Sequence, residues 1–255
     1  MTNQDQAPRR GALITGASWG IGHATAVGLA RDGFDVAITD LTTEALAKTA
    51  AAVEAAGRRA IPIALDVRDQ ASVEAAVASA AAALPGLDVL VNNAGVPSPG
   101  KPAVELTRAD WDMIIAINLT GAFFMSTAMG RMLIAAKRPG CVVSLASTHG
   151  TVGFAGASAY GIAKAGISHM TRMLAIEWAS HGIRVNAIAP GTTATESRQR
   201  VLTDPERRER MLSRIPLGRF GTAEEMGGAI RYLVSPIASY ITGQILLLDG
   251  GLTAC

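Results

Sequence analysis

A tyrosine and a lysine lie four residues apart, at Tyr160 and Lys164, within the stretch SAYGIAKAG. On a helix this spacing places both side chains on one face, so a phenol would lie beside an ammonium. A free tyrosine has a pKa of about 10, and a neighbouring cation favours its ionised form. The pair can therefore exchange protons near neutrality, although a buried tyrosine beside a surface lysine would show the same spacing.

A glycine-rich segment, TGASWGIGHATAVGLA, follows directly after the apolar run at residues 12–15. Its glycines, Gly16, Gly20 and Gly22, stand between a predicted strand and a predicted helix. Glycines there permit a tight turn and a close approach to a ligand, and free N–H groups at the start of a helix attract phosphate. Taken alone, the segment is equally compatible with a simple turn.

An acidic residue, Asp40, ends the next apolar run, FDVAITD, about 20 residues beyond the glycines. At the end of a second parallel strand, a carboxylate can accept hydrogen bonds from the ribose hydroxyls of adenosine. It would also repel the 2′-phosphate of NADP, and Leu41, Thr42 and Thr43 carry no positive charge to offset that repulsion. The segment predicts NAD as the coenzyme; the alternative for Asp40 is an N-cap of the following helix.

Apolar runs with β-branched residues alternate with alanine-rich segments of helical spacing, such as TTEALAKTAAAVEAA. Strands that alternate with helices form βαβ units and a parallel sheet, whose strands are apolar on both faces. The runs lie at residues 12–15, 36–39, 60–65, 87–91, 141–145, 184–188 and 245–248. They predict an α/β fold, a Rossmann-like doubly wound parallel sheet of about seven strands with helices on both faces.

The alternation continues almost to the last residue without a linker, a repeat or a low-complexity block. Residues 11–255 are therefore predicted to form a single dinucleotide-binding catalytic domain, and residues 1–10 a disordered tail. The arginine-rich segment 192–220 interrupts the pattern before the last helix and strand. It is predicted to be an excursion that closes over the substrate as a lid, with a solvated surface helix as the alternative.

Charge and cysteine content limit the possible partners. With 23 basic and 21 acidic side chains and a formal net charge of +2, the chain is too balanced for strong attraction to nucleic acid or an acidic membrane. Cys141 and Cys255 form neither a disulfide framework nor a metal-binding spacing, so no metal and a cytoplasmic location are expected. The apolar stretch 113–136 is long enough to cross a bilayer, but polar residues interrupt it, and a buried helix is expected instead.

The motifs form an ordered set. The loop has the spacing Gly-x-x-x-Gly-x-Gly, and it precedes NNAG at 92–95, a serine at Ser147 and Tyr-x-x-x-Lys at 160–164. In this order the set resembles the short-chain dehydrogenase/reductase family, over nearly the whole chain from Thr15 to Gly251. The resemblance implies an oxidoreductase that interconverts a secondary alcohol and a ketone with a nicotinamide coenzyme.

The resemblance also implies roles for individual residues. Tyr160 would be the general acid/base, Ser147 would polarise the reacting oxygen, and Lys164 would bind the nicotinamide ribose and support the phenolate. Asn118, in NLTG, would hold a water that connects this lysine to solvent. The expected coenzyme contacts are Gly16, Ser18, Trp19, Gly20, Ile21, Gly22, Asp40, Asp66, Val67, Asn93, Ala94, Gly95, Tyr160, Lys164, Pro190, Gly191, Thr193 and Thr195. The expected substrate contacts are Ser147, His149 and Tyr160.

Two positions refine these expectations by the same resemblance. Trp19 occupies a loop position where many NADP-using members carry a basic residue, which again favours NAD. Relatives that reduce 3-oxoacyl groups on acyl carrier protein use two basic docking positions; Arg138 retains one, and His181 replaces the arginine at the other. A 3-oxoacyl thioester (on acyl carrier protein or CoA) is therefore the alternative substrate.

The preferred substrate is a small sugar, polyol or sugar acid, because His149 and the hydroxyl- and arginine-bearing segment 192–200 can supply hydrogen bonds and a carboxylate partner. A nucleotide-sugar epimerase or dehydratase is a rival function within the same resemblance. It is disfavoured because such enzymes resemble chains with a longer C-terminal substrate domain, whereas Cys255 comes directly after the last predicted strand here. A non-catalytic dinucleotide-binding regulator would carry a damaged Ser, Tyr, Lys or Asn, and all four are present.

The chain is also expected to associate with itself. The helices expected within 113–136 and 163–179 are apolar over more of their surface than one sheet face can cover. The closing stretch YITGQILLLDGG offers a second self-complementary surface. A homo-oligomer is expected, and by resemblance to the family a homotetramer.

Overall fold

The computed structural model describes residues 10–196 and 203–254, in which seven strands form one sheet. The strand order is β3-β2-β1-β4-β5-β6-β9, and every pairing is parallel. The strands are β1 (Gly11–Thr15), β2 (Asp35–Asp40), β3 (Ala60–Ala64), β4 (Leu87–Asn92), β5 (Gly140–Leu145), β6 (Ile183–Pro190) and β9 (Ile245–Leu248). All seven predicted strands are confirmed, and each observed end lies within two residues of the predicted one.

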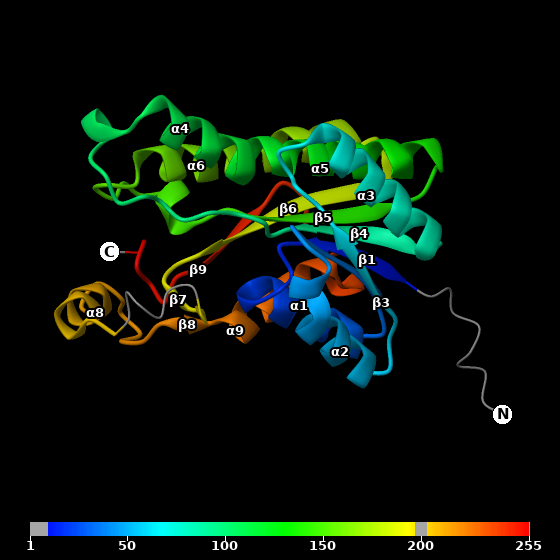
Figure 1. Cartoon of the computed structure of the whole chain (residues 1–255), viewed down its shortest axis with the longest axis horizontal. Coiled ribbons are helices and arrows are strands. Elements are labelled where there is room, and N and C mark those ends of the chain that lie inside the picture. The colour runs from blue at the N-terminus through cyan, green and yellow to red at the C-terminus, as the bar shows by residue number, and fades with distance from the viewer. Residues whose placement is uncertain (1–9, 197–202, 255) are drawn as a thin grey trace.

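Helices cover both faces of the sheet, as Figure 1 shows. One face carries α1 (Gly20–Arg31), α2 (Ala47–Ala55) and α9 (Ala223–Val234); the other carries α3 (Gln70–Ala83), α4 (Arg108–Ile115), α5 (Gly121–Ala135) and α6 (Ser158–Trp178). Successive strand residues point to opposite faces, so Ala12 and Ile14 pack in one core and Leu13 in the other. The predicted single-domain α/β fold is thereby confirmed.

Side chains fix the starts of several helices. Thr107 accepts a hydrogen bond from the backbone N–H of Asp110, whose carboxylate accepts one in return from Thr107 N at 3.0 Å. Thr222 and Glu225 form the same reciprocal pair at the start of α9. Each pair satisfies N–H groups that the first turn of a helix leaves without partners, so these polar residues set where the helices begin.

The apolar stretch 113–136 is not one regular helix. A π-helical turn, Ala116–Thr120, separates α4 from α5. The run Arg108–Ala135 is long and apolar enough to cross a membrane by length and composition, but half of its most apolar window is buried within the structure. Since Met125, Met129 and Leu133 of α5 belong to the core beneath it, the run serves as a core helix.

The excursion at 192–220 is partly described. It contains β7 (Thr193–Ala194), α8 (Pro205–Leu212) and β8 (Gly221–Thr222); residues 197–202 lie outside the described part. Strands β7 and β8 pair in parallel, and α8 lies beside them (Figure 1). Its predicted closure over a substrate stays a prediction.

Arg10, the last residue of the predicted N-terminal tail, is the first residue that the structure describes. Residues 1–9 lie outside the described part, but Arg10 has a defined place: its Nε donates to Asp88 Oδ2 at 3.0 Å, and its guanidinium lies over the Phe34 ring. These two contacts hold Arg10 against the sheet, and the predicted tail before it stays a prediction.

Candidate active site

A cleft of about 540 Å³ opens among the loops that follow the carboxyl ends of the strands. Ligands of open parallel sheets bind at this edge, where neighbouring strands connect in opposite directions. Its lining includes all four predicted catalytic residues and most predicted coenzyme contacts: Asn118, Ser147, Tyr160, Lys164, Gly16, Trp19, Ile21, Asp40, Asp66, Val67, Asn93, Ala94, Gly95, Pro190, Gly191, Thr193 and Thr195. The fold thus brings together residues that are distant in sequence.

Four predicted contacts lie outside that lining: Ser18, Gly20, Gly22 and His149. The two glycines shape the loop between β1 and α1. Gly20 has a φ of +59°, and a Cβ at Gly22 would lie 2.3 Å from the carbonyl oxygen of Gly16. Trp19, the residue before α1, makes no side-chain cap, so N–H groups at the helix start remain available to a phosphate.

Asn93 fastens this loop to the end of β4. Its Nδ2 donates to the carbonyl oxygens of Thr15 at 2.9 Å and Gly16 at 2.6 Å. In return, Thr15 Oγ1 accepts hydrogen bonds from the backbone N–H groups of Asn93 and Ala94 at 3.0 and 2.9 Å. The NNAG motif therefore holds the glycine loop in shape from the neighbouring strand.

Asp40, at the end of β2, lines the cleft with both carboxylate oxygens engaged. Ser18 Oγ donates to Oδ2 at 2.5 Å, and the backbone N–H of Leu41 donates to Oδ1 at 2.9 Å. The hydrogen bond from Ser18 therefore orients the carboxylate of Asp40. An oxygen that accepts one hydrogen bond can accept another, so this arrangement still suits a ribose hydroxyl.

Arg68 also lines the cleft, and the sequence analysis missed it. Its guanidinium donates hydrogen bonds to the carboxylate of Asp66: Nη2 lies 2.6 Å from Oδ2, and Nε lies 3.0 Å from both oxygens. These hydrogen bonds lower the pKa of Asp66 below its usual range. The signal in the sequence was a cation two residues after the acid at the end of β3. Within the described residues, Arg68 and Lys164 are the cations that line the cleft.

Lys164 is buried beside Tyr160. Its Nζ lies 5.6 Å from the centre of the Tyr160 ring and donates to the carbonyl oxygen of Leu145, at the end of β5, at 2.7 Å. Burial lowers the pKa of Lys164 to about 8, so the side chain carries its charge at neutral pH. A cation in this position favours the phenolate form of the tyrosine.

Asn118 lies at the centre of the π-helical turn and is almost fully buried. Its Nδ2 donates to the carbonyl oxygens of Ile114 and Val96, each at 3.1 Å, and its Oδ1 accepts from Val96 N at 3.3 Å. A Cβ at Gly95 would lie 2.7 Å from that Oδ1. The amide braces the loop after β4, and the predicted water relay stays a prediction.

Ser147 and His149 stand together after β5. Ser147 Oγ accepts from the backbone N–H of His149 at 3.2 Å and lies 3.4 Å from its Nδ1. The imidazole stacks on Phe154, with ring centres 4.2 Å apart, and meets the Tyr160 ring edge-on at 5.5 Å. His149 thus contacts two of the predicted catalytic residues from outside the cleft, and its contact with substrate stays a prediction.

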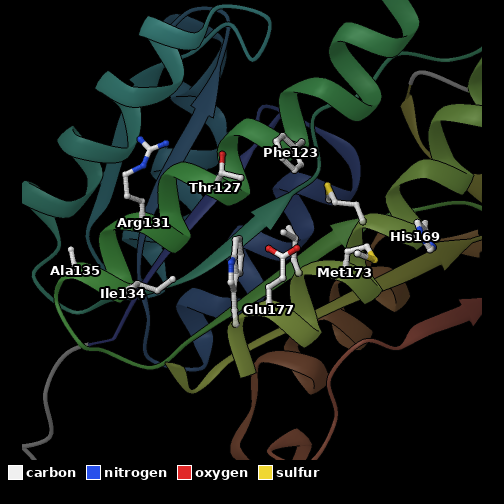
Figure 2. A pocket seen from close by; sticks show the side chains of 11 residues that line it. Phe123, Thr127, Arg131, Ile134, Ala135, His169, Met173 and Glu177 are labelled. Atoms are coloured by element: carbon white, nitrogen blue, oxygen red, sulfur yellow. The ribbon is translucent and has the colours of Figure 1, made fainter. Parts of the chain in front are cut away.

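A second hollow, of about 740 Å³, lies between α5 and α6 (Figure 2). Phe123, Met173 and Trp178 give it an apolar lining, and Arg131 and Glu177 add one charge of each sign. Its lining contains none of the predicted site residues. Across the described ranges, no three His, Cys, Asp or Glu side chains are placed to hold a metal ion.

The residues of the first cleft fit a nicotinamide dinucleotide. The uncapped start of α1 suits a pyrophosphate, the carboxylate of Asp40 suits a ribose hydroxyl, and the polar group around Tyr160 lines the same cleft. Residues 16–253 also match the family model described as enoyl-(acyl carrier protein) reductase.

Known proteins resemble the chain over nearly its full length. It is 36% identical over 242 residues to the gluconate 5-dehydrogenase of Gluconobacter oxydans (strain 621H), covering 95% of this chain and 94% of that protein. It is 43% identical over 245 residues to the cis-4-hydroxycyclohexanecarboxylate dehydrogenase of Sinomonas cyclohexanicum, covering 96% and 97%. A solved Agrobacterium tumefaciens structure with bound NADP has a TM-score of 0.91 and 37% identity, covering 100% of both chains. The chain belongs to the short-chain dehydrogenase/reductase family and is an NAD(P)-dependent oxidoreductase that acts on CH–OH groups.

Proposed function

We propose that this enzyme interconverts a secondary alcohol and a ketone in a small sugar, polyol or sugar acid, with NAD(H) as the preferred coenzyme. The observation that carries the proposal is the gathering of Ser147, Tyr160 and Lys164 in one cleft with Asp40, which ends β2 and so lies three strands away from β5 in the sheet. The names of the two relatives described above support the substrate class, because gluconate and cis-4-hydroxycyclohexanecarboxylate are both small hydroxy carboxylates.

In the oxidative direction, the phenolate of Tyr160 accepts the proton of the substrate hydroxyl. Ser147 donates its hydroxyl hydrogen to the same substrate oxygen and holds it in place. Lys164, fixed by the carbonyl of Leu145, stabilises the phenolate through its charge. When bound, the nicotinamide supplies the hydride chemistry, and the protein supplies position and the path of the proton.

The preference for NAD rests on charge at the adenosine end of the cleft. Asp40 presents a carboxylate where NADP carries an extra phosphate, and the two negative charges repel. Arg68 offers an opposing positive charge in the same cleft, but Asp66 already neutralises it through three hydrogen bonds. NAD is therefore the preferred coenzyme and NADP a weaker one.

A 3-oxoacyl thioester is the second candidate substrate, and the description of the matching family model supports it only in naming acyl carrier protein. Docking of an acyl carrier protein would need free basic groups on the surface. Arg138, the retained docking position, instead donates to the carbonyl oxygens of Pro85 at 2.8 Å and Leu87 at 3.1 Å. Because its guanidinium already holds the turn before β4, this candidate ranks second.

The enzyme is proposed to be a cytoplasmic homotetramer with two distinct self-contacts. The hollow between α5 and α6 is the first, because Arg131 and Glu177 line it with opposite charges that a two-fold axis can bring face to face. The unpaired edge of β9 is the second, since Leu246 and Leu247 are exposed there. Cys141, a buried free thiol, suits a reducing compartment.

Steady-state turnover tests the function. The purified enzyme should reduce NAD with members of a panel of alditols, aldoses and aldonates, and reduce the matching ketones with NADH. The same panel should include 3-hydroxyacyl thioesters and steroid alcohols. Activity confined to those lipophilic compounds would contradict the proposed substrate class and leave the family assignment in place.

A further inference from the structure

A column of side chains connects the segment after α8 to the predicted catalytic residues. The guanidinium carbon of Arg214 lies 5.0 Å from the centre of the Phe154 ring. Phe154 stacks on His149 at 4.2 Å, and His149 meets the Tyr160 ring at 5.5 Å while its Nδ1 lies 3.4 Å from Ser147 Oγ. A single wall of rings therefore runs from the reacting groups to one arginine.

We propose that Arg214 binds the carboxylate of a hydroxy-acid substrate whose secondary hydroxyl reacts at Tyr160. The inference rests on the proposed function and narrows it, since it selects sugar acids and related hydroxy acids over neutral sugars and polyols. A planar guanidinium binds a carboxylate through two parallel hydrogen bonds, which supplies orientation as well as charge.

Backbone contacts fix the position of Arg214. The next residue, Ile215, is buried, and its N–H donates to Leu212 O, in the last turn of α8, at 2.9 Å. Leu217 N donates to the carbonyl oxygen of Gly250 at 3.1 Å, which ties the segment to the turn after β9. A guanidinium that orients a substrate needs a backbone held in place, and the hydrogen bonds of Ile215 and Leu217 hold the backbone on the C-terminal side of Arg214.

The positive charge of Arg214 is also available to a ligand. Within the described ranges no carboxylate forms an ion pair with it, whereas Arg219 pairs with Glu225 and Arg231 pairs with Asp32. Its contact is instead the face of Phe154, which attracts a guanidinium through the ring quadrupole and leaves the N–H groups at its edge able to donate. An incoming carboxylate therefore meets an oriented cation without having to displace an anion.

The middle of the column suits a chain of hydroxyls. His149 is held closely against the start of α6, because a Cβ at Gly161 would lie 2.9 Å from the carbonyl oxygen of His149. A fixed imidazole can donate to or accept from hydroxyl groups. A polyhydroxy acid thus finds proton transfer at Tyr160, polar contact at His149 and its carboxylate partner at Arg214.

The test compares acids with their neutral counterparts. The probes are aldonates, such as gluconate, and the alditols that carry CH₂OH in place of the carboxylate, such as sorbitol. Arg214→Gln removes the charge and keeps the length of the side chain. The matched control is Arg208→Gln, because Arg208 lies 5.8 Å from the centre of the Phe220 ring, a ring outside the column. NADH affinity, measured by fluorescence titration, reports whether each variant is folded.

The expected result is a rise of about 10-fold or more in KM for the aldonates in Arg214→Gln, because a charge-assisted contact is lost. Turnover of the alditols, NADH affinity and all constants of Arg208→Gln should stay within about twofold of the wild-type values. Arg214→Lys should recover part of the aldonate affinity, since it restores the charge without the planar fork.

Four outcomes would overturn the inference. If Arg214→Gln impaired the use of acids and alditols equally, or left the KM for the acids unchanged, the carboxylate subsite would be rejected. If the wild-type enzyme turned over alditols and no aldonate, the carboxylate subsite would also be rejected, whereas the proposed function would still hold. Turnover of neither class rejects the proposed function, and the subsite falls with it.

Discussion

The ammonium of Lys164 lies 5.6 Å from the centre of the Tyr160 ring, one helical turn away on α6. The same ammonium is held by the carbonyl oxygen of Leu145 at 2.7 Å, so the sheet sets its position. Its charge therefore acts on the phenol from a fixed place, as the proposed proton transfer requires.

Removal of the phenol oxygen should abolish proton transfer and leave the rest of the site in place. We expect Tyr160→Phe to lower kcat by about 100-fold or more, while NADH affinity stays within about threefold of wild type. Stopped-flow turnover and fluorescence titration give the two values. Tyr232→Phe, at an exposed tyrosine of α9, is the control and should behave as wild type. Near-normal turnover of Tyr160→Phe would refute the assignment of the acid/base.

The buried lysine should leave a signature in the dependence of stability on pH. The pKa of Lys164 is about 8 in the folded protein and about 10.4 in an unfolded chain. Between these values the unfolded chain binds a proton that the native state has lost, so rising pH favours the native state. Below about pH 8 both states are protonated, and this contribution is constant.

The comparison is made against Lys164→Met, with both proteins in the Tyr160→Phe background so that the titration of the tyrosine cancels. Between about pH 7.5 and pH 9.5, the free energy of unfolding should rise by on the order of 1–2 kcal/mol more in the protein with the lysine. Urea unfolding at each pH measures it. If the free energies of unfolding of the two proteins changed in parallel with pH, the pKa of Lys164 would not be lowered in the folded state.

Coenzyme preference should follow the charges at the adenosine end. Asp40→Ala combined with Leu41→Arg removes a repulsive carboxylate and adds a cation, so the ratio of kcat/KM for NADP over NAD should rise by about 100-fold or more. Arg68→Ala in the wild-type background should lower the same ratio, because the carboxylate of Asp66 loses its cation and becomes a second unpaired negative charge in the cleft. A wild-type enzyme with higher kcat/KM for NADP than for NAD would invalidate this account.

A methyl group at Gly22 should disturb the phosphate loop. Its Cβ would lie 2.3 Å from the carbonyl oxygen of Gly16, so the backbone must move. We expect Gly22→Ala to lose about 1–3 kcal/mol of stability and to weaken NADH binding at least about 10-fold. Gly228→Ala is the control: it lies in α9, where the added Cβ would meet no described atom within 4 Å beyond its chain neighbours and its own helix backbone, and it should gain about 0.5–1 kcal/mol. Equal behaviour of the two variants would contradict the tight fit.

The two proposed self-contacts should be separable by mutation. Met173→Glu places a charge in the apolar hollow of Figure 2, and Leu247→Glu places one on the open edge of β9. Each should convert a tetramer into a dimer, and the double variant should be monomeric. Glu54→Lys, exposed on α2 on the opposite face, should stay tetrameric. Light scattering reads the mass, and a monomeric wild type at micromolar concentration would exclude the proposal.

Much of the fold was predictable because it rests on local signals. β-Branched apolar runs marked the strands, and the glycines of the first loop marked backbone positions such as Gly16, which has a φ of +62°. The π-helical turn at Asn118 was not predictable, since AINLT contains no residue that breaks a helix. It is stabilised by contacts with Val96, which only the folded chain provides.

The candidate site shows the same division. The motif residues were found because their types and order are distinctive, whereas Arg68 and Arg214 belong to no motif. Their possible roles depend on what lies next to them in space: a carboxylate at Asp66 and an aromatic ring at Phe154. The carboxylate partner was expected within 192–200, where Arg200 and its neighbours lie outside the described residues. Arg214 lies further along the same excursion.

The strand order also bears on how the protein is synthesised. β1 is made first, yet it lies inside the sheet, between β2 and β4. Its partner Val89 leaves the ribosome long after Ala12, on the order of 4–15 s later at about 5–20 residues per second. During that interval an apolar strand edge is open, and such edges template aggregation. Ribosome pausing before β4 would therefore lower the soluble yield more than a pause of equal length after it.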